Sequence, residues 1–577
     1  MYILGLNIGH NSTACLLKDG KIVGCVSEER FSRIKNHFGF PKQSISYLLK
    51  EFSIKEENLD MVVLDGHYSF SENPEMRNLL FDYYTKKHFF QNLLSFLGYK
   101  FPNTFSFYRS IRGKTKPSNS LLKVMISKEL YLPKERIYII DHHLVHSNSV
   151  IANLSNKDKS LVFTLDGEGM SLCGTVSIFD GKNLKKISSS DKSASLGYLY
   201  AAITAFLGMK PLEHEFKVMG LAPYAKEHNV LKVYPKLKEL FYIDDSLRFQ
   251  SKFEMVFSDH FLKEEMKYVR FDTLSGAIQK LIEDLAVEWI KKAIIKTGIN
   301  NLALSGGVFM NVKANQKIME MPEVKKLFVV PSSGDESNAI GSCLYGYKRY
   351  CEENNLKLDM KPITHLYLGP EYNDDYIEKY IKREKLQESY TIKKSSNINK
   401  EIAKLLAKGE IVARCSGRSE WGARALGNRS ILANPKHPDT IRVLNETIKD
   451  RDFWMPFTPS ILDKFANRYL VNPKKVYAPY MNITFNSTKE AQQKMPAAMH
   501  PYDLTVRPQV VYKSWNPDYY EVIEEFSKLT GTGAILNTSF NLHGEPNVLK
   551  PEDAIHTVKN SSLKYLAMGS YLFKKNV

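Results

Sequence analysis

The chain has 577 residues, of which 43% are hydrophobic and 25% charged, and its formal net charge at pH 7 is +17. This length exceeds what one hydrophobic core organises, so we expect two or three globular domains. The lysines are scattered rather than grouped in blocks, which disfavours a nucleic-acid partner and suits a basic surface that meets phosphate-bearing small molecules.

The first residues and the cysteines indicate a cytoplasmic protein. The start, MYILGLNIGHNSTACLLKDG, lacks the basic opening and the uninterrupted apolar core of a signal peptide. No stretch approaches the ~18 apolar residues of a membrane-spanning helix. The six cysteines lie far apart without a Cys-x-x-Cys pair, which disfavours a disulfide framework and a zinc ribbon. We therefore expect reduced cysteines and no membrane partner.

The residues up to position 30 predict three strands joined by polar turns. The strands are YILGLNI, TACLLK and KIVGCVSE, with GHNS after the first and an Asp-Gly hairpin turn after the second. Residues 161–187 repeat this order of strands and turns. The repeat predicts a duplicated α/β domain whose two halves face one cleft.

Residues 67–130 look like an insertion rich in aromatic side chains, as in FDYYTKKHFFQNLLSFLGYKF. Aromatic stripes are more typical of a packed core, so we expect a helical pair that buries these rings. The alternative is a lid that binds an acceptor molecule.

Three histidines stand close together in DHHLVH, directly after an apolar run. His142 and His146 are four residues apart, so on a helix they share one face and can bind one ion, while His143 points elsewhere. Asp166 stands at the tip of the second hairpin and Asp335 at a later glycine turn, where a shared cleft would bring them together. Two imidazoles and two carboxylates suit iron, manganese or zinc. The alternative is that both histidines are structural.

Two strand-to-helix junctions follow, NLALSGGVFMNVKANQKI at 301–318 and LFVVPSSGDESNAIGSCLYGYKRY at 327–350. Glycine lets the backbone approach a ligand closely, and a helix N-terminus favours anionic groups. Together with the two hairpins, these turns resemble the arrangement of actin-like (ASKHA) ATPases, which have two phosphate hairpins and an adenosine motif.

His10 follows the first strand in IGHNST. In an actin-like protein this turn presents polar side chains to the distal end of the nucleotide, so the imidazole is a candidate general base for an attacking hydroxyl. The alternative is a turn histidine that is bonded to the local backbone.

The polar stretch CEENNLKLDMKP places a domain boundary near residue 355, which predicts a domain at 1–355 and a second α/β domain at 356–577. The second domain carries arginines and amides in short turns such as GARALGNRSIL and NTSFNLHGEP. Guanidinium groups pair two oxygens at once, which favours a phosphate clamp over surface salt bridges. The candidates are Arg418, Arg424, Arg429, Lys449, Arg451 and Arg507.

The motifs GHNSTACLL, SEERFSRIKNHFGFP, DHHLVH, EFKVMGLAPYA, LSGGVFMN, GARALGNRSIL and NTSFNLHGEP occur in this order. They resemble the NodU and antibiotic-tailoring family of O-carbamoyltransferases over essentially the whole chain except the aromatic insertion. The resemblance implies a duplicated ASKHA domain, like that of the tRNA threonylcarbamoyladenosine synthases, followed by a YrdC-like domain.

The resemblance also implies an activity. Carbamoyl phosphate enters the YrdC-like domain, and a carbamoyl group derived from it passes internally to the ASKHA domain, where it reacts with ATP to give carbamoyl adenylate and pyrophosphate. A hydroxyl of a small-molecule acceptor then attacks the adenylate. Sugars, aminoglycosides, macrolide-like products and Nod-factor glycans are all candidate acceptors, and the sequence leaves the oligomeric state open.

Several site residues follow from the resemblance alone. His142, His146, Asp166 and Asp335 match metal ligands, usually of Fe(II), with Mg or Mn as alternatives, and His10 matches the acceptor's base. The nucleotide contacts match Lys217, Gly306, Gly307 and Asn311. Glu29 and Arg33 match residues that face the reaction chamber. The carbamoyl phosphate contacts match Arg424, Arg429, Lys449, Arg451, Arg507 and Asn537.

Four positions depart from the family's pattern. Asn11 replaces a usual Asp beside His10, which removes a charge next to the candidate base. The other three replacements alter backbone freedom rather than functional groups. They are Ser337 for Gly, Ala423 for Pro and Leu504 for Gly.

Three other functions compete with carbamoyl transfer. A small-metabolite kinase uses the same ASKHA fold and would release ADP, but it leaves the arginine-rich second domain unexplained. A tRNA-modifying threonylcarbamoyl enzyme would use similar domains, although NTSFNLHGEP argues against it. An ATP-gated scaffold of the actin or chaperone type would need no His10.

Overall fold

The structure is a computed structural model that describes residues 1–66, 119–445 and 452–576. Most of the aromatic insertion predicted at 67–130 lies outside the described residues. The part that is described, α6 (Asn119–Leu130), packs into the core of the first sheet through Leu122 and Ile126.

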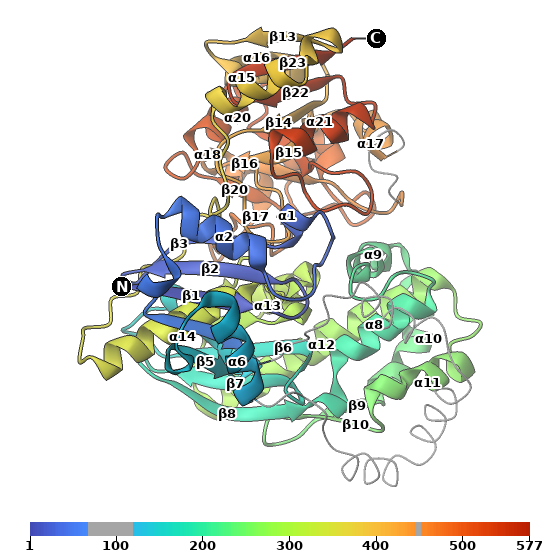
Figure 1. The fold of residues 1–577 in the computed structure, drawn as a ribbon. Coiled ribbons are helices and arrows are strands. Elements are labelled where there is room, and N and C mark those ends of the chain that lie inside the picture. Colours follow the sequence, from blue (N-terminus) through green and yellow to red (C-terminus); the bar gives the residue numbers. More distant parts are fainter. Residues whose placement is uncertain (67–118, 446–451, 577) are drawn as a thin grey trace. The chain divides into compact units, whose positions relative to one another are not determined.

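The chain divides into two compact units (Figure 1). The first comprises Met1–Val23 and Phe38–Pro362, and the second comprises Gly24–His37 and Ile363–Val577. Both units are α/β, as the sequence predicts. A short N-terminal segment therefore belongs to the same unit as the C-terminal part of the chain.

The first sheet of the first unit has the strand order β3-β2-β1-β4-β5. The antiparallel partner of β1 is β2, and the parallel ladder runs from β1 through β4 to β5. The bounds are β1 (Tyr2–Asn7), β2 (Thr13–Lys18), β3 (Lys21–Ser27), β4 (Met61–Asp65) and β5 (Ile137–Ile140).

The second sheet has the order β12-β11-β6-β7-β8. Read from β8, it has the same arrangement as the first sheet read from β3: three strands that are consecutive in the chain, then two strands that come later. Its meander β6-β7-β8 is antiparallel, and the parallel ladder runs from β6 through β11 to β12. The bounds are β6 (Ser160–Gly169), β7 (Leu172–Phe179), β8 (Leu184–Asp191), β11 (Asn301–Ser305) and β12 (Lys326–Val329). The duplication predicted from the two hairpins is present.

Helices cover both sheets, and the longest described one, α12 (Phe271–Thr297), buries Trp289 against Phe163 of β6 with ring centroids 5.0 Å apart. Further helices of this unit are α2 (Lys42–Glu51), α7 (His142–Asn148), α8 (Leu196–Phe206), α9 (Glu215–Leu221), α10 (Glu227–Lys238), α11 (Ser258–Glu265), α13 (Val312–Glu320) and α14 (Ser337–Glu353). A small ribbon pairs β9 (Phe241–Ile243) with β10 (Phe249–Ser251).

The helices α7 and α14 approach each other unusually closely. Gly341 of α14 lies against the end of α7, and a Cβ built there would stand 2.0 Å from the carbonyl oxygen of Val145. Real Cβ atoms do not approach backbone oxygens this closely, so this contact needs glycine. The start of α7 is capped by Asp141, whose side chain accepts the backbone N–H of Leu144 at 2.9 Å.

The second unit is built on a mixed sheet with the order β13-β23-β22-β14-β15-β21-β16-β20. Its core packs α16 and α20 against the sheet through side chains such as Ile402 and Phe526. The strands are β13 (Tyr390–Lys394), β14 (Val412–Cys415), β15 (Arg429–Ala433), β16 (Thr458–Leu462), β20 (Gln509–Val511), β21 (Ala534–Ser539), β22 (Tyr565–Met568) and β23 (Tyr571–Lys575).

The remaining elements of the second unit surround this sheet. The helices are α1 (Glu29–Ser32), α15 (Asp374–Arg383), α16 (Ile398–Ala407), α17 (Asp439–Leu444), α18 (Asp463–Tyr469), α19 (Lys489–Lys494), α20 (Pro517–Thr530) and α21 (Pro551–Lys559). A second sheet has β17 (Leu470–Val471), β18 (Phe485–Ser487) and β19 (Thr505–Val506). Among the described helices of both units, none has the length and apolar character needed to cross a bilayer.

The close contact at Gly341 gives a test of the packing. We expect Gly341→Ala to lower the free energy of unfolding by about 1–3 kcal/mol, because the added methyl forces α7 and α14 apart. The matched control is Ser342→Ala on the same helix, which removes a buried hydroxyl that has no hydrogen-bond partner among the described residues. Denaturant unfolding of the full chain measures both, and equal stability of the two variants would contradict this packing.

Candidate metal centre and the loops of the second unit

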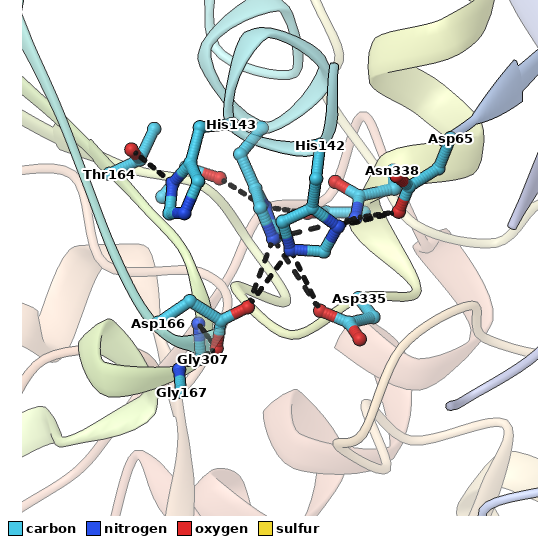
Figure 2. A network of polar contacts seen from close by, with 12 residues as sticks. Asp65, His142, His143, Thr164, Asp166, Gly167, Gly307, Asp335 and Asn338 are labelled. Atoms are coloured by element: carbon cyan, nitrogen blue, oxygen red, sulfur yellow. Dashed lines mark hydrogen bonds and ion pairs between the residues drawn. The ribbon is translucent and has the colours of Figure 1, made fainter. Parts of the chain in front are cut away.

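Four side chains of the first unit converge on one point, as Figure 2 shows for three of them by label. His142, His146, Asp166 and Asp335 each offer a ligand atom, and these atoms lie within 4.8 Å of one another. Both imidazoles are fully buried, whereas the carboxylate side chains keep 14% and 16% exposure. The structure thus brings together the four metal ligands predicted from the sequence.

The four side chains come from three separate places in the duplicated fold. His142 and His146 occupy one face of α7, Asp166 stands near the end of β6, and Asp335 precedes α14. The Nε2 atoms of the two histidines lie 3.1 and 3.5 Å from Oδ2 of Asp166. Nε2 of His146 also lies 3.5 Å from Oδ1 of Asp335. The ring nitrogens and the carboxylate oxygens therefore face the same small volume.

The two candidate histidine ligands are each held in place by a second group. Nδ1 of His142 donates to Oδ2 of Asp65 at 2.8 Å, and the same oxygen accepts from Nδ2 of Asn338 at 2.8 Å. Nδ1 of His146 lies 3.2 Å from the hydroxyl of Ser305. A carboxylate behind a histidine fixes the ring and increases its basicity, which is typical of metal sites. The donor set fits a divalent ion.

The carboxylate of Asp166 is oriented by backbone amides. Its Oδ1 accepts from the N–H of Gly167 at 2.8 Å and from that of Gly307 at 3.2 Å, so Oδ2 is left to face the histidines. Gly306 has φ of 100°, and a Cβ there would lie 2.5 Å from the carbonyl oxygen of Leu165. The turn Ser-Gly-Gly therefore lies directly against the tip of the second hairpin.

Asp65 was not among the residues singled out from the sequence. It ends β4 in the run VVLDG, which resembles the run FTLDG within β6, where Asp166 stands. This likeness between two apolar runs that are each followed by Asp-Gly is the sequence signal that could have identified Asp65. Its side chain is fully buried, so its charge requires the partners described above.

Opposite charges dominate the electrostatics of the cluster. Burial lowers the pKa of His142, but the carboxylate of Asp65 and the bond to Asp166 outweigh it and raise this pKa well above its ordinary value. Burial also opposes the charged form of His146, yet its contacts with Asp166 and Asp335 raise its pKa. The pKa of Asp166 is held well below its ordinary value by the two histidines, against the effect of burial.

His143 points away from the cluster, as the sequence predicts (Figure 2). Its Nε2–H donates to the carbonyl oxygen of Leu172 at 3.1 Å, and its Nδ1 lies 2.8 Å from the hydroxyl of Thr164. Burial, followed by repulsion from His142 and His146, lowers its pKa to about 3. His143 is therefore a neutral core residue.

His10 lies in the turn between β1 and β2, partly exposed, and its ring packs edge-on against that of Phe38 with the ring centroids 5.3 Å apart. The neighbouring Asn11 has φ of 56°, a conformation that asparagine tolerates better than most residues. Nδ2 of Asn11 donates to Oε2 of buried Glu336 at 3.3 Å. An aspartate at position 11 would face this carboxylate, so the replacement of the family's usual Asp suits the local charge.

The candidate nucleotide contacts lie on separate elements. Gly306 and Gly307 lie against Asp166, as described above. Asn311 caps α13 by accepting the N–H of Ala314 at 3.0 Å, and its amide exchanges two hydrogen bonds with Gln279 of α12. Lys217 lies on α9, two residues after Glu215, whose pKa is raised to about 7 by burial.

In the second unit, the loop that contains GARALGNR is organised by a buried carboxylate that the sequence analysis missed. Oε1 of Glu420 accepts the backbone N–H groups of Leu426 at 2.8 Å, Asn428 at 2.7 Å and Arg429 at 3.2 Å. Gly427 in this loop has φ of 112°. An anion inside the loop fixes its shape without any contribution from a ligand.

Arg429 is 1% exposed, and its guanidinium donates to backbone carbonyl oxygens throughout. Its Nε donates to Leu549 at 2.8 Å, and its Nη1 donates to Gly417 at 3.0 Å and to Asn428 at 2.9 Å. The structure therefore gives Arg429 a scaffold role. Its Nη2 donates to the carbonyl oxygen of Pro370 at 3.3 Å and carries a second N–H group, so a contact of Arg429 with an anion, as the resemblance implies, stays a prediction.

The other candidate anion contacts differ in accessibility. Arg424 and Arg507 are partly exposed, whereas Asn537 is 1% exposed. Nδ2 of Asn537 donates to the carbonyl oxygen of Ala425 at 3.0 Å, while its Oδ1 accepts no hydrogen bond from the part of the chain that is described. Lys449 and Arg451 lie outside the described residues.

Arg418, another candidate for the phosphate clamp, donates to the carbonyl oxygens of Gly369 at 3.1 Å and Leu368 at 2.8 Å. Glu29 accepts the N–H of Asn36 at 2.9 Å, and Arg33 donates to two carbonyl oxygens of the second unit.

The structure shows the backbone conformation or the burial of the other three residues that depart from the family pattern. Leu504 has φ of 56°, a region that favours the family's glycine, and its side chain is 39% exposed. Ala423 is exposed. Ser337 is fully buried, with its hydroxyl 3.3 Å from Nδ1 of His146.

Comparison with known families assigns both parts of the chain. Residues 2–344 match the carbamoyltransferase N-terminus, and residues 403–575 match the carbamoyltransferase C-terminus. The chain belongs to the carbamoyltransferase family. The protein is therefore a carbamoyltransferase enzyme, which confirms the resemblance seen in the sequence motifs.

Relatives of this carbamoyltransferase cover most of its length. An uncharacterized protein of Methanocaldococcus jannaschii is 31% identical over 99% of each chain, and a second from the same organism is 33% identical over 80% of this chain and 77% of its own. The nodulation protein NolNO of Sinorhizobium fredii is 28% identical over 98% of this chain and 79% of its own. Full-length HypF, in a phosphate- and nucleotide-bound crystal form, aligns with 62% of this chain and 56% of its own at 14% identity and a TM-score of 0.38.

The hydrogen bond between Asp65 and His142 predicts that Asp65 affects the affinity for a metal ion. We expect Asp65→Asn to weaken metal binding by about 10–100-fold, because the imidazole loses the carboxylate that orients it and increases its basicity. The control is Asp141→Asn, which removes the same charge beside His142 but keeps a good helix cap. Metal titration of the stripped enzyme, checked by elemental analysis, compares the two. Unchanged affinity in Asp65→Asn would contradict this account.

The raised pKa values predict that protons compete with the metal. His142 and His146 hold protons to a higher pH than ordinary histidines, and both must lose them to bind an ion. We therefore expect metal affinity to increase with pH and to keep increasing above about pH 6.5, the ordinary histidine pKa. Affinity measured across neutral and mildly alkaline pH tests this, and a constant affinity over that range would contradict it.

Proposed function

We propose that this carbamoyltransferase uses ATP to move the carbamoyl group of carbamoyl phosphate, through carbamoyl adenylate, to a hydroxyl of a small-molecule acceptor such as a sugar or an antibiotic. The observation that carries the proposal is the four-residue cluster beside a glycine turn. Backbone N–H groups, a glycine turn and a candidate cation site together suit the phosphates of a nucleotide.

The duplicated sheets support an actin-like (ASKHA) assignment for the first unit. Each sheet carries an antiparallel meander and two parallel strands in the same order. In this reading the polar turns after β1 and β6, together with the turns after β11 and β12, line the nucleotide site. The matched carbamoyltransferase C-terminus then supplies the domain that receives carbamoyl phosphate, which we propose to be YrdC-like.

His142, His146, Asp166 and Asp335 would hold the metal ion. Two nitrogen and two oxygen donors suit Fe(II) better than Mg(II), which prefers an all-oxygen shell, and they also suit Mn(II). A bound divalent ion would neutralise charge on the phosphate oxygens of the adenylate.

The protein's own residues account for the acceptor step. The acceptor's hydroxyl oxygen attacks the carbamoyl carbon, the bond from that carbon to the AMP oxygen breaks, and the hydroxyl proton passes to His10. His10 is suited to this role because it is partly exposed at the end of β1, and its ring lies against Phe38. The bond from Asn11 to Glu336 steadies the same turn.

The loops of the second unit support a site for the carbamoyl donor. Arg424 and Arg507 are partly exposed, as is Arg418, so these candidates are accessible to a phosphate. Asn537 offers a buried amide oxygen that accepts no bond from a described residue, and such an oxygen suits the amino group of a carbamoyl.

Product analysis tests the reaction. Incubation with ATP, carbamoyl phosphate and Fe(II) should yield carbamoyl adenylate, or AMP and pyrophosphate, only when carbamoyl phosphate is present. ADP formed without carbamoyl phosphate would instead indicate a kinase. Intact ATP under all these conditions would contradict the proposal.

The variant His10→Ala separates the formation of carbamoyl adenylate from the transfer of the carbamoyl group to the acceptor. We expect this variant to exchange pyrophosphate with ATP in the presence of carbamoyl phosphate at close to the normal rate, while transfer to an acceptor falls by about 10²–10⁴-fold. The control is His228→Ala, which changes an exposed histidine on α10. Normal acceptor transfer by His10→Ala would remove His10 from the mechanism.

A further inference from the structure

The segment Gly24–His37 forms part of the second unit, although it lies near the start of the chain. Its helix, α1, is the blue element beside the red and orange strands in Figure 1. Two arginines of this segment donate to backbone carbonyl oxygens of the unit's loops. These bonds join residues more than 390 positions apart in the chain.

Arg33 bridges two neighbouring carbonyl groups. Its Nη1 donates to the oxygen of Asn547 at 2.7 Å, and its Nη2 donates to the oxygen of Pro546 at 2.8 Å. Carboxylate oxygens of Glu545 and Asp553 lie 3.7 and 3.9 Å from its Nη2 and Nε, so the guanidinium also pairs with negative charge. Arg33 itself has φ of 60°, so the chain adopts a left-handed conformation to present this side chain.

Arg30 holds a second loop. It is 6% exposed, and its Nη2 donates to the carbonyl oxygen of Gly422 at 2.8 Å. Gly422 lies two residues before Arg424, one of the partly exposed candidates for the anion site. The position of Arg424 therefore depends on a bond from the N-terminal segment.

The two loops are also joined to each other. Nδ2 of Asn547 donates to the carbonyl oxygen of Arg429 at 2.9 Å, and Nε of Arg429 donates back to the carbonyl oxygen of Leu549 at 2.8 Å. A displacement of the loop at 545–547 is thereby passed to the end of the GARALGNR loop. Arg33 binds the first of these loops, through the carbonyl oxygens of Pro546 and Asn547.

We propose that Arg30 and Arg33 are positioning residues of the carbamoyl phosphate site, which makes the N-terminal segment a working part of that site. The inference rests on the proposed function, because it assumes that these loops bind the donor. Neither arginine needs to touch the donor. Each fixes a loop through main-chain carbonyls, and a planar guanidinium spans two such acceptors in a way that a lysine ammonium does not.

A purely structural role makes a different prediction. If the arginines only stabilise the fold, their replacement lowers the stability of the whole enzyme and affects all of its ligands alike. If they position the donor site, replacement weakens carbamoyl phosphate binding and leaves ATP binding intact.

The test uses the full-length enzyme with Arg33→Lys, and Arg30→Lys as a second variant. We expect the dissociation constant and the KM for carbamoyl phosphate to rise about tenfold, because the loss of one charge-assisted hydrogen bond has an effect of this size. The KM for ATP and the kcat should stay near normal. The matched control is Arg136→Lys in the first unit, where Nη1 also bridges two carbonyl oxygens, those of Glu57 and Leu59, each at 3.0 Å. This control should leave carbamoyl phosphate affinity unchanged.

Calorimetric titration with carbamoyl phosphate, and separately with ATP, distinguishes the outcomes. Selective loss of carbamoyl phosphate affinity in Arg33→Lys supports the inference. Equal affinity of the unsubstituted enzyme and both variants would overturn the inference alone, as would a parallel loss of affinity for both ligands. If the unsubstituted enzyme binds no carbamoyl phosphate, the proposed function fails and the inference fails with it.

Discussion

The arrangement of the first unit depends on two carboxylates held beside two buried imidazoles. Asp166 and Asp335 repel each other at this separation in a region of low dielectric constant, so the cluster needs positive charge between them. Protons on the histidines or a divalent ion can supply that charge, and either choice keeps the side chains aimed at one point. The tight contact between α7 and α14 then fixes the distance between the histidines and Asp335.

The duplicated fold explains how distant residues reach this cluster. Parallel strands in each sheet end at a common edge, and a polar turn or a helix follows each of them. Asp65 is the last residue of β4 and Asp166 lies in the last part of β6, one as the support of a histidine and the other as a candidate ligand. Asp-Gly pairs late in two strands thus supply one candidate ligand and one group that orients a ligand.

The sequence predicted the parts of the site that depend on local spacing. The four-residue interval between His142 and His146 identified one helix face, and the hairpin repeat identified the duplication. It missed Asp65, although VVLDG resembles FTLDG, because the bond of Asp65 to His142 depends on the packing of β4 against α7. The sequence also predicts that Arg429 contacts carbamoyl phosphate and that Arg33 faces the reaction chamber, and both stay predictions. The bonds of these arginines to main-chain carbonyls depend on long-range packing, which local spacing does not record. The inclusion of Gly24–His37 in the second unit depends on the same kind of contact.

The central claim is that four residues from one duplicated fold hold one metal ion, and anomalous diffraction from crystals of the Fe(II)-loaded enzyme tests it most directly. The account predicts a single strong peak bounded by Nε2 of both histidines and by oxygens of Asp166 and Asp335. A principal peak elsewhere in the chain, or an ion at this point that lacks the two imidazoles, would contradict it.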